Sequence, residues 1–386
     1  MPGALDGVRI LDLTWGAAGA LGVLLLAEQG TDTLKVEPPG GDPFRSYDGY
    51  KVWTRSRRAV QVDLKAEAGQ RAFHRLVETA DVVVESFRPG VADRLGVGYA
   101  ACAATNPRLV YCSVPAWPEG HRFADRAGYD ALVQAAAGQQ WEQPGWRPGP
   151  IFLAMPMPSM GTIYLVASGV LAALIAREST GRGQHVRTSL LQGVLLYTTQ
   201  IWQYIEKADA AVYGLMAKTN PPGVHQGMIF ECADREFVHI SVMSGKTPTK
   251  TLDEILDVEA LPAAEVEGLL PLEAQNLMNV RRREAFKAWK RDELVAELIA
   301  NNQIGEAVVT PEEQFEHPQL QANDMAVRVE DRELGSVTQM GVPIHLLGTP
   351  GAIVGPQPAV GEHDAEVFGD LGYSADEIAQ ITGGRR

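Results

Sequence analysis

The sequence is poor in cysteine and has no uninterrupted hydrophobic run of membrane-spanning length. Its three cysteines, Cys102, Cys112 and Cys232, show no metal-ligand spacing, and an odd number argues against a disulfide framework. We therefore expect buried thiols in a reducing cytoplasm. The longest apolar run, residues 163–176, is interrupted by Ser168 and falls short of the roughly 20 residues that a membrane span needs. No metal site and no membrane partner are expected.

Positive charge is also scarce. The chain has 34 Lys and Arg against 48 Asp and Glu, a net charge of −14. An acidic protein of this kind is a poor general binder of nucleic acid or of anionic membranes, so neither is expected as a partner. A polyanionic ligand would need a local basic pocket. The first residues lack a basic segment followed by an apolar one, so no signal peptide is expected and we predict a cytoplasmic protein.

The hydrophobic pattern indicates an α/β fold. The 386 residues, 45% of them hydrophobic, can bury a large core, and the length favours about two domains. Short apolar segments at 8–13, 33–36, 60–64, 81–85 and 109–113 predict strands, and periodic segments at 21–29 and 66–79 predict helices between them. This alternation is typical of a parallel, doubly wound sheet. After a linker at 219–223, a hairpin over 228–242 and charged helices across 250–300 indicate a smaller α+β domain.

Several short motifs follow one another at characteristic spacing. They are LDGVRILDL at 5–13, KVEPPGGD at 35–42, ESFRPG at 85–90, RLG at 94–96, NPRLVY at 106–111, GYD at 128–130 with Gln134, GVLAAL at 169–174, TGRGQ at 180–184 and GEH at 361–363. In their order and spacing they resemble the family III CoA-transferases, the group of formyl-CoA transferase and carnitine CoA-transferase. The resemblance spans essentially the whole chain.

The resemblance implies a fold and an assembly. The large domain is expected to be Rossmann-like, formed by residues 1–215 together with a C-terminal part, 326–386, that returns to it. A smaller domain, with its linker, is expected at 216–325. Two subunits of such proteins pass through each other as interlocked rings, so the expected partner is a homologous family III subunit or a second copy of this chain.

The resemblance also implies a site for coenzyme A, which enters as part of an acyl-CoA substrate. By position, its contacts fall on Trp15, Gly16, Ala17, Ala18, Lys65, Ser86, Phe87, Arg88 and Arg94. Small residues between a strand and a helix let backbone N–H groups approach an anionic ligand. Arg88, Arg94 and Lys65 would supply charge for phosphates; alternatively, the two arginines pair with Glu85 and Asp93. The GxGxxG fingerprint of nicotinamide-binding proteins is not matched.

One position departs from the family. These enzymes use an Asp ten residues before the glycine of the 169–174 segment, and that position here is Ser159. A carboxylate suits thioester exchange because its anhydride and thioester intermediates lie close in energy. A serine ester is more stable than a thioester, so return of CoA would be uphill. We therefore expect Ser159 not to be nucleophilic but to cap a helix beginning near Met160.

No other residue is an evident substitute. Residues 154–158 contain no Asp, Glu or His, Glu142 lies too far upstream, and Asp130 already belongs to the GYD motif. Racemases of the same superfamily use a His and an Asp, which would fall on Tyr129 and Ser159. Racemase activity is therefore not expected, and Tyr129 stays a candidate catalytic residue at its position in the site.

Three functional hypotheses remain. The first is that the chain is the Asp-lacking subunit of a heteromeric CoA-transferase, as in benzylsuccinate CoA-transferase. The second is a self-sufficient enzyme in which the acceptor carboxylate attacks the acyl-CoA directly. The third is a non-catalytic acyl-CoA-binding protein. The acyl donor and the acceptor stay open in all three.

Overall fold

The computed structural model describes residues 2–142, 150–197, 228–241, 247–269 and 271–384. The chain divides into two compact units. The large unit comprises Met1–Gln139, Phe152–Gln200 and Gln319–Arg386, and the small unit comprises Gln140–Ile151 and Ile201–Pro318. The domain boundary expected at residues 215 and 216, and the linker at 219–223, lie outside the described residues. The C-terminal segment joins the large unit from residue 319, where the sequence predicted 326.

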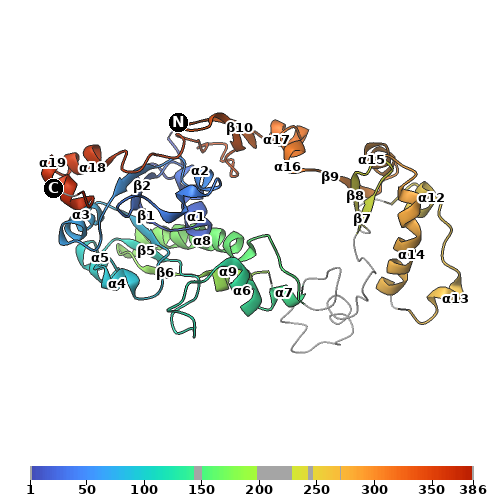
Figure 1. Ribbon diagram of the computed structural model, residues 1–386, viewed down its shortest axis with the longest axis horizontal. Coiled ribbons are helices and arrows are strands. Elements are labelled where there is room, and N and C mark those ends of the chain that lie inside the picture. The colour runs from blue at the N-terminus through green and yellow to red at the C-terminus, as the bar shows by residue number, and fades with distance from the viewer. Residues whose placement is uncertain (1, 143–149, 198–227, 242–246, 270, 385–386) are drawn as a thin grey trace. The chain divides into compact units, whose positions relative to one another are not determined.

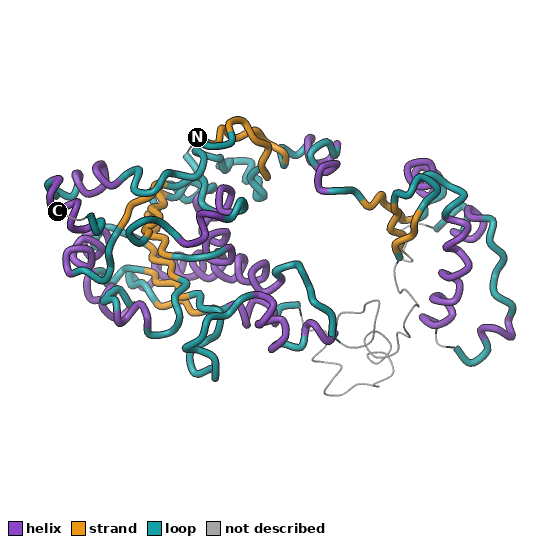
Figure 2. Tube along the Cα trace, in the orientation of Figure 1, coloured by secondary structure: helices purple, strands orange, loops and turns teal. Residues whose placement is uncertain are grey.

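A six-stranded parallel sheet forms the centre of the large unit, as the sequence predicted (Figure 2). Its strands are β1 (Arg9–Leu13), β2 (Asp32–Glu37), β3 (Arg58–Gln61), β4 (Val82–Glu85), β5 (Val110–Ser113) and β6 (His185–Arg187). They lie in the order β3-β2-β1-β4-β5-β6, so the progression of the chain reverses between β1 and β4. Open parallel sheets bind ligands beyond the carboxyl ends of their strands at this kind of reversal.

Helices cover both faces of the sheet (Figure 1). The helices α1 (Ala17–Ala27) and α8 (Met157–Thr180) pack on one face, and α3 (Glu67–Val77), α5 (Tyr99–Thr105), α18 (Asp364–Asp370) and α19 (Ala375–Ile381) pack on the other. This explains why β4 is apolar at successive positions instead of alternating, since both its faces are buried. The two C-terminal helices contact β3 and α3, which places the end of the chain beside its first hundred residues.

The remaining elements of the large unit are short. They are a 3-10 turn at Pro43–Ser46, α2 (Tyr50–Trp53), α4 (Val91–Arg94), α6 (Asp130–Ala136), α9 (Leu190–Leu195), and the antiparallel pair β10 (Ala326–Asp331) and β11 (Gly335–Met340). Helix α17 (Pro318–Ala322) begins at the division between the units. All three cysteines are free and buried, as predicted, and burial raises the pKa of the Cys102 thiol to about 12.

The small unit contains a three-stranded antiparallel sheet and several helices. The strands β7 (Ile229–Glu231), β8 (Phe237–Ser241) and β9 (Ile304–Val308) pair in that order, which confirms the predicted hairpin and adds a strand to it. The helices are α7 (Gln139–Glu142), α12 (Leu252–Leu256), α13 (Ala263–Val266), α14 (Pro271–Phe286), α15 (Arg291–Ala300) and α16 (Pro311–Gln314). Phe230 stacks on Phe286 at a centroid distance of 4.1 Å and forms the centre of this unit's core.

Helix α8 begins three residues before the start near Met160 that the sequence predicted. It has 24 residues, and by length and composition it is the one described helix that could cross a membrane. Its Val166, Val170 and Ala173 are buried in the same core cluster as strands β4 and β5. We therefore interpret α8 as a core helix of the α/β unit, since such helices share the apolar composition of membrane spans. One face of it, with Tyr164 and Ile175, remains exposed.

The first turns of α8 cross α9 at very short range. A Cβ atom added to Gly193 would lie 2.2 Å from Thr162 Oγ1 and 2.4 Å from the Pro158 carbonyl oxygen. On the other helix, a Cβ atom at Gly161 would lie 2.2 Å from the Gly193 carbonyl oxygen. Thr162 Oγ1 in turn donates to the Pro158 carbonyl oxygen at 2.7 Å. Glycine at both positions therefore fixes how closely the start of α8 approaches α9.

We expect Gly193→Ala to lower the free energy of unfolding by about 1–3 kcal/mol or more, because the added methyl overpacks this crossing. The measurement is urea unfolding followed by circular dichroism. Gly369→Ala is the matched control, since Gly369 is an exposed residue of helix α18 with no atom within 4 Å of the added Cβ. It should be neutral or stabilise by roughly 0.5–1 kcal/mol. Equal effects of the two substitutions would contradict the tight crossing.

Candidate functional site

A cavity of about 1040 Å³ lies at the carboxyl edge of the parallel sheet in the large unit. Its lining comes from the segments that follow β1, β2, β3, β4 and β5, together with the start of α6 and of α8. Small-molecule sites commonly occupy about 300–1,000 Å³, so this one suits a large ligand. All the predicted site residues except Arg94 line it: Trp15, Gly16, Ala17, Ala18, Lys65, Ser86, Phe87, Arg88, Tyr129 and Ser159.

Hydrogen bonds join the loop after β1 to the loop after β4 at the point where the strand order reverses. Ser86 Oγ accepts a hydrogen bond from the Trp15 N–H at 2.6 Å and donates one to the Trp15 carbonyl oxygen at 3.1 Å. The rings of Trp15 and Phe87 meet edge to face, with centroids 5.8 Å apart. Gly16 then begins α1 with φ 76°, a conformation that favours glycine. The result is a rigid aromatic wall at the centre of the cavity edge.

A cluster of buried charged residues packs against the loop that follows β1. Lys35 is fully enclosed, donates to the Thr14 carbonyl oxygen, and lies 3.8 Å from Asp12 Oδ1 and 3.3 Å from Asp42 Oδ2. Arg57 forms an ion pair with the other oxygen of Asp12. Burial by itself would raise the pKa of Asp12, but Lys35 and Arg57 hold that pKa below its ordinary value. The loop therefore rests on a charge cluster that loses its pairing if any member is removed.

The predicted basic residues occupy different places. Arg88 and Lys65 are exposed at the cavity, and Arg88 donates to the Asp125 carbonyl oxygen at 2.8 Å. Arg94 is exposed at the end of α4 and does not line the cavity. Within the described part of the chain, neither arginine forms the alternative ion pair with Glu85 or Asp93. Arg88 and Lys65 therefore remain available to an anionic ligand.

Ser159 does not cap α8, so that prediction was wrong. The helix begins at Met157, and Ser159 is its third residue, buried at 4% exposure. The Ser159 N–H donates to Asp130 Oδ1 at 2.7 Å, and the Ser159 Oγ donates to Asp130 Oδ2 at 2.8 Å. The cap is thus a carboxylate from α6, because its oxygens accept more strongly than a hydroxyl and complement the positive end of the helix.

Sequence reasoning set Asp130 aside as a substitute carboxylate because it belongs to the GYD motif. It lines the cavity, and its Oδ2 lies 2.8 Å from the hydroxyl of Ser159, the residue on which the resemblance places the family Asp. One turn further along α6, Gln134 Nε2 donates to the Met155 carbonyl oxygen at 2.7 Å, which holds the segment leading into α8. Tyr129 precedes Asp130 and exposes 62% of its surface. The GYD motif was the available signal, but its sequence distance from Ser159 concealed the contact.

Two other carboxylates line the cavity, and both have different surroundings. Glu37 is buried and accepts from the Arg45 guanidinium at 2.7 Å and from the Tyr50 hydroxyl at 2.9 Å. Asp63 accepts from the Lys65 N–H at 3.0 Å in the turn after β3. Glu37 is therefore neutralised by its ion pair, and Asp63 belongs to the turn that carries Lys65. Asp130 is the carboxylate that lies at the α8 end of the cavity.

A fourth carboxyl group lies just behind the cavity wall. Glu85, the last residue of β4, is buried and accepts a hydrogen bond from the Phe87 N–H at 2.7 Å. Burial, with a smaller contribution from Asp93, raises the pKa of Glu85 to about 7 despite hydrogen bonds from Ser113 and Phe87. The ionisation of this group is therefore coupled to the segment that carries Ser86, Phe87 and Arg88.

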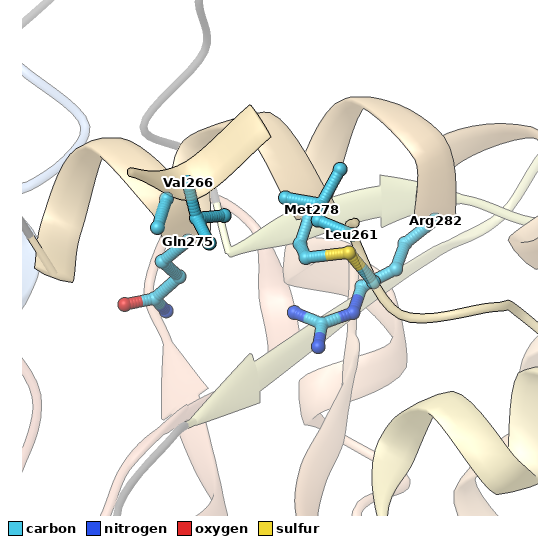
Figure 3. Close-up of a pocket in the computed structure, with 6 residues that line it drawn as sticks. Leu261, Val266, Gln275, Met278 and Arg282 are labelled. Carbon is cyan, nitrogen blue, oxygen red and sulfur yellow. The ribbon is translucent and has the colours of Figure 1, made fainter. Parts of the chain in front are cut away.

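A second, smaller cavity of about 370 Å³ lies in the small unit (Figure 3). Leu261, Val266, Met278 and Arg282 contribute to its lining. The Arg282 guanidinium is already engaged by both carboxylate oxygens of Asp253, at 2.6 and 2.8 Å, so it offers little charge to a ligand. Across the described ranges no cluster of three His, Cys, Asp or Glu side chains suits a metal ion. The candidate site is therefore the large cavity.

The architecture and the cavity define an α/β protein with a cavity large enough for a large ligand at the carboxyl edge of a parallel sheet. The family model of CoA-transferase family III matches residues 5–364. The chain belongs to this family, whose members named below exchange CoA between acyl groups and carboxylic acids.

Characterised relatives match along nearly the full chain. It is 30% identical to the formyl-CoA:oxalate CoA-transferase of Streptomyces avermitilis, covering 98% of both sequences. It is 28% identical to the succinyl-CoA–D-citramalate CoA-transferase of Chloroflexus aurantiacus, covering 98% of this chain and 97% of the relative. Among solved structures, a CaiB/BaiF family protein from Brucella suis superposes with a TM-score of 0.79 at 25% identity, covering 96% of this chain and 100% of that one. The predicted family and enzyme class are confirmed.

The raised pKa of Glu85 predicts a pH-dependent stability. Between pH 4.5 and about 7 the folded state keeps a proton that the unfolded chain has lost, so folding stability falls as the pH rises through this window. We expect Glu85→Gln to remove this loss of stability. The free energy of unfolding of the variant, relative to that of the parent chain, should increase by about 3 kcal/mol from pH 4.5 to 8. Urea unfolding at several pH values measures it.

The matched control is Glu78→Gln, which removes a carboxylate from an exposed side chain at the end of α3. A difference between Glu85→Gln and the parent chain that does not change with pH would contradict the assigned environment of Glu85.

Proposed function

We propose that this protein transfers CoA between an acyl-CoA thioester and a carboxylic acid, and that the reaction takes place in the cavity of the large unit. One observation carries the proposal. In a chain that matches the family over residues 5–364, one cavity connects the Trp15 and Ser86 loops with the buried Ser159 at the start of α8 and its partner, the half-buried Asp130.

We assign the CoA moiety to the loops after β1, β3 and β4. The region of Gly16, Ala17 and Ala18 allows close approach to the first turn of α1, and Trp15 with Phe87 offers an aromatic surface. Arg88 and Lys65 supply positive charge for phosphates at the exposed side. Arg94 would contribute from outside the cavity. The order of the strands is that of Rossmann-like nucleotide-binding sheets, which supports this placement.

The acyl group then points towards Ser159, and the chain lacks a carboxylate at that position. In the first arrangement that we propose, the chain is one subunit of a heteromer, and a homologous subunit with an Asp at the equivalent position supplies the nucleophile. The stability of a serine ester relative to a thioester supports a non-nucleophilic serine, whose hydroxyl here donates to the Asp130 carboxylate.

The exposed face of α8 supports the pairing of this chain with a second family III subunit, of its own kind or of another. Tyr164 and Ile175 expose 63% and 73% of their surface, and the small residues Ser168 and Ala172 lie between them on the same face. Large apolar side chains next to small ones permit close approach of another polypeptide. Interlocked rings, as in the family, would cover such a face, and we place the assembly in the cytoplasm.

In the second arrangement, the chain acts without an Asp-bearing partner. One observation favours it: Asp130 brings a carboxylate of this same chain to the α8 end of the cavity. A protein that only binds acyl-CoA would use the same loops but turn over in no mixture, and the experiments below separate it from both arrangements.

CoA binding is tested first. Arg88→Ala should weaken CoA binding about 10-fold, because it removes an exposed guanidinium at the cavity, where a charge-assisted hydrogen bond is worth roughly 1.5–3 kcal/mol. Isothermal titration calorimetry with CoA measures the effect. Arg71→Ala, on the exposed surface of α3 outside the cavity, is the control and should bind as the parent chain does. Equal affinities in all three proteins would remove Arg88 from the site.

Transfer is tested with the purified chain alone and mixed with an Asp-bearing family III subunit from the same organism. Chromatography of acyl-CoAs over a panel of donors and carboxylic acid acceptors measures turnover. Turnover only in the mixture supports the heteromer, and turnover by the chain alone supports the second arrangement. Binding of CoA with no exchange in either sample would overturn the transferase function in favour of a binding role.

A further inference from the structure

Thioester exchange between two acids places a specific demand on the enzyme group that takes part. The group must form an acyl derivative that CoA thiolate can open again, and the anhydride and thioester of a carboxylate meet this condition whereas a serine ester does not. The candidates for this group are therefore the carboxylates that line the cavity. Of these, Glu37 is neutralised by Arg45, and Asp63 forms the turn that carries Lys65.

Asp130 meets the geometric condition. Its Oδ2 lies 2.8 Å from Ser159 Oγ, so an acyl carbon seated over Ser159 is also within reach of the Asp130 carboxylate. Both oxygens are held by donors from α8, one by the Ser159 N–H and one by the Ser159 hydroxyl, which fixes the orientation of the group. Each carboxylate oxygen has a second lone pair that these bonds do not use.

We infer that Asp130 is the carboxylate nucleophile of this chain, and that Ser159 orients it. The inference rests on the proposed CoA transfer and selects the arrangement in which the chain works alone. Asp130 is the first residue of α6 and lies beside the N-terminus of α8. The partial positive charge at these helix N-termini favours an anion there. Ser159 is then a positioning residue, and its buried hydroxyl acts through Asp130.

The chemistry balances without a further reactant. An Asp130 oxygen attacks the thioester carbonyl carbon, the C–S bond breaks, and CoA thiolate is released. The donor acyl group is then joined to Asp130 as a mixed anhydride. The thiolate attacks the Asp130 carbonyl carbon and releases the donor as a free carboxylate, which leaves CoA joined to Asp130 as a thioester. The acceptor carboxylate then attacks this thioester and displaces CoA thiolate, which gives an anhydride between Asp130 and the acceptor. The thiolate attacks the acceptor acyl carbon of that anhydride, which forms the product acyl-CoA and restores the Asp130 carboxylate.

The decisive experiment maps the covalent intermediate on the unmodified chain. The protein is incubated with an acyl-CoA, treated with borohydride or hydroxylamine, digested, and analysed by peptide mass spectrometry. Borohydride reduces a thioester on Asp130 to the corresponding alcohol, and hydroxylamine gives a hydroxamate there. We expect the modified residue to be Asp130. Because CoA cannot form a thioester on a hydroxyl, this adduct also excludes Ser159 as the group that carries CoA.

Two variants supply independent readouts. Asp130→Asn keeps an acceptor for the Ser159 N–H but removes the nucleophile, and we expect no adduct and a loss of kcat of about 10³-fold or more. Ser159→Ala keeps the nucleophile and loses one donor to it, so the adduct should persist on Asp130 with kcat reduced about 10- to 100-fold. Circular dichroism and calorimetry with CoA establish that both variants fold and bind.

The double variant with Asp130→Asn and Ser159→Asp tests the position itself. It returns a carboxylate to residue 159, and we expect it to recover adduct formation there, with transfer raised at least about 10-fold over Asp130→Asn alone. This comparison keeps the inference testable even if loss of the Asp130 charge weakens the start of α8.

The possible failures are distinct. Turnover by the chain alone that survives Asp130→Asn, or an adduct confined to the Asp of an added subunit, would overturn the role of Asp130 and leave CoA transfer standing. Absence of exchange both alone and with such a subunit would overturn the proposed function and this inference together.

Discussion

The contact between the Asp130 carboxylate and the first turn of α8 is the constraint on which the site depends. It ties α6 to α8 through the N–H and the hydroxyl of Ser159, and Gln134 adds a second tie one turn away. The close crossing of Gly161 and Gly193 then fixes α8 against α9. Three helices therefore converge on one buried serine, and a carboxylate rather than a hydroxyl satisfies the positive end of the 24-residue helix.

The opposite wall of the cavity is held by a different kind of interaction. Lys35, Asp12 and Arg57 form a buried charge cluster under the β1 loop, and Ser86 joins this loop to the one after β4. Such clusters are costly to bury, and removal of one member leaves an unpaired charge. Here the charge cluster and the Ser86 hydrogen bonds join the loops after β1 and β4 into one wall. Arg88 is exposed in the loop after β4, and Lys65 is exposed in the turn after β3.

Much of the large unit could be predicted from the sequence because its signals are local. Each strand of the first half was expected within a few residues of its observed position, and the apolar character of β4 follows from helices on both faces. The start of α8 was placed three residues too late, since serine is a preferred capping residue and residue 159 is a serine. A proline in the first turn is in fact compatible with a helix, because its missing N–H has no partner there in any case.

The sequence by itself determined the order of strands and helices, the family, and the serine at residue 159, where the resemblance implies an aspartate in other members. These depend on periodicity and on motifs that are contiguous along the chain. Only the tertiary structure decided that the carboxylate of Asp130, 29 residues before Ser159, lies 2.8 Å from the Ser159 hydroxyl. That contact arises from the packing of α6, α8 and α9, and the distance between two helix starts in space is not encoded in their separation along the sequence.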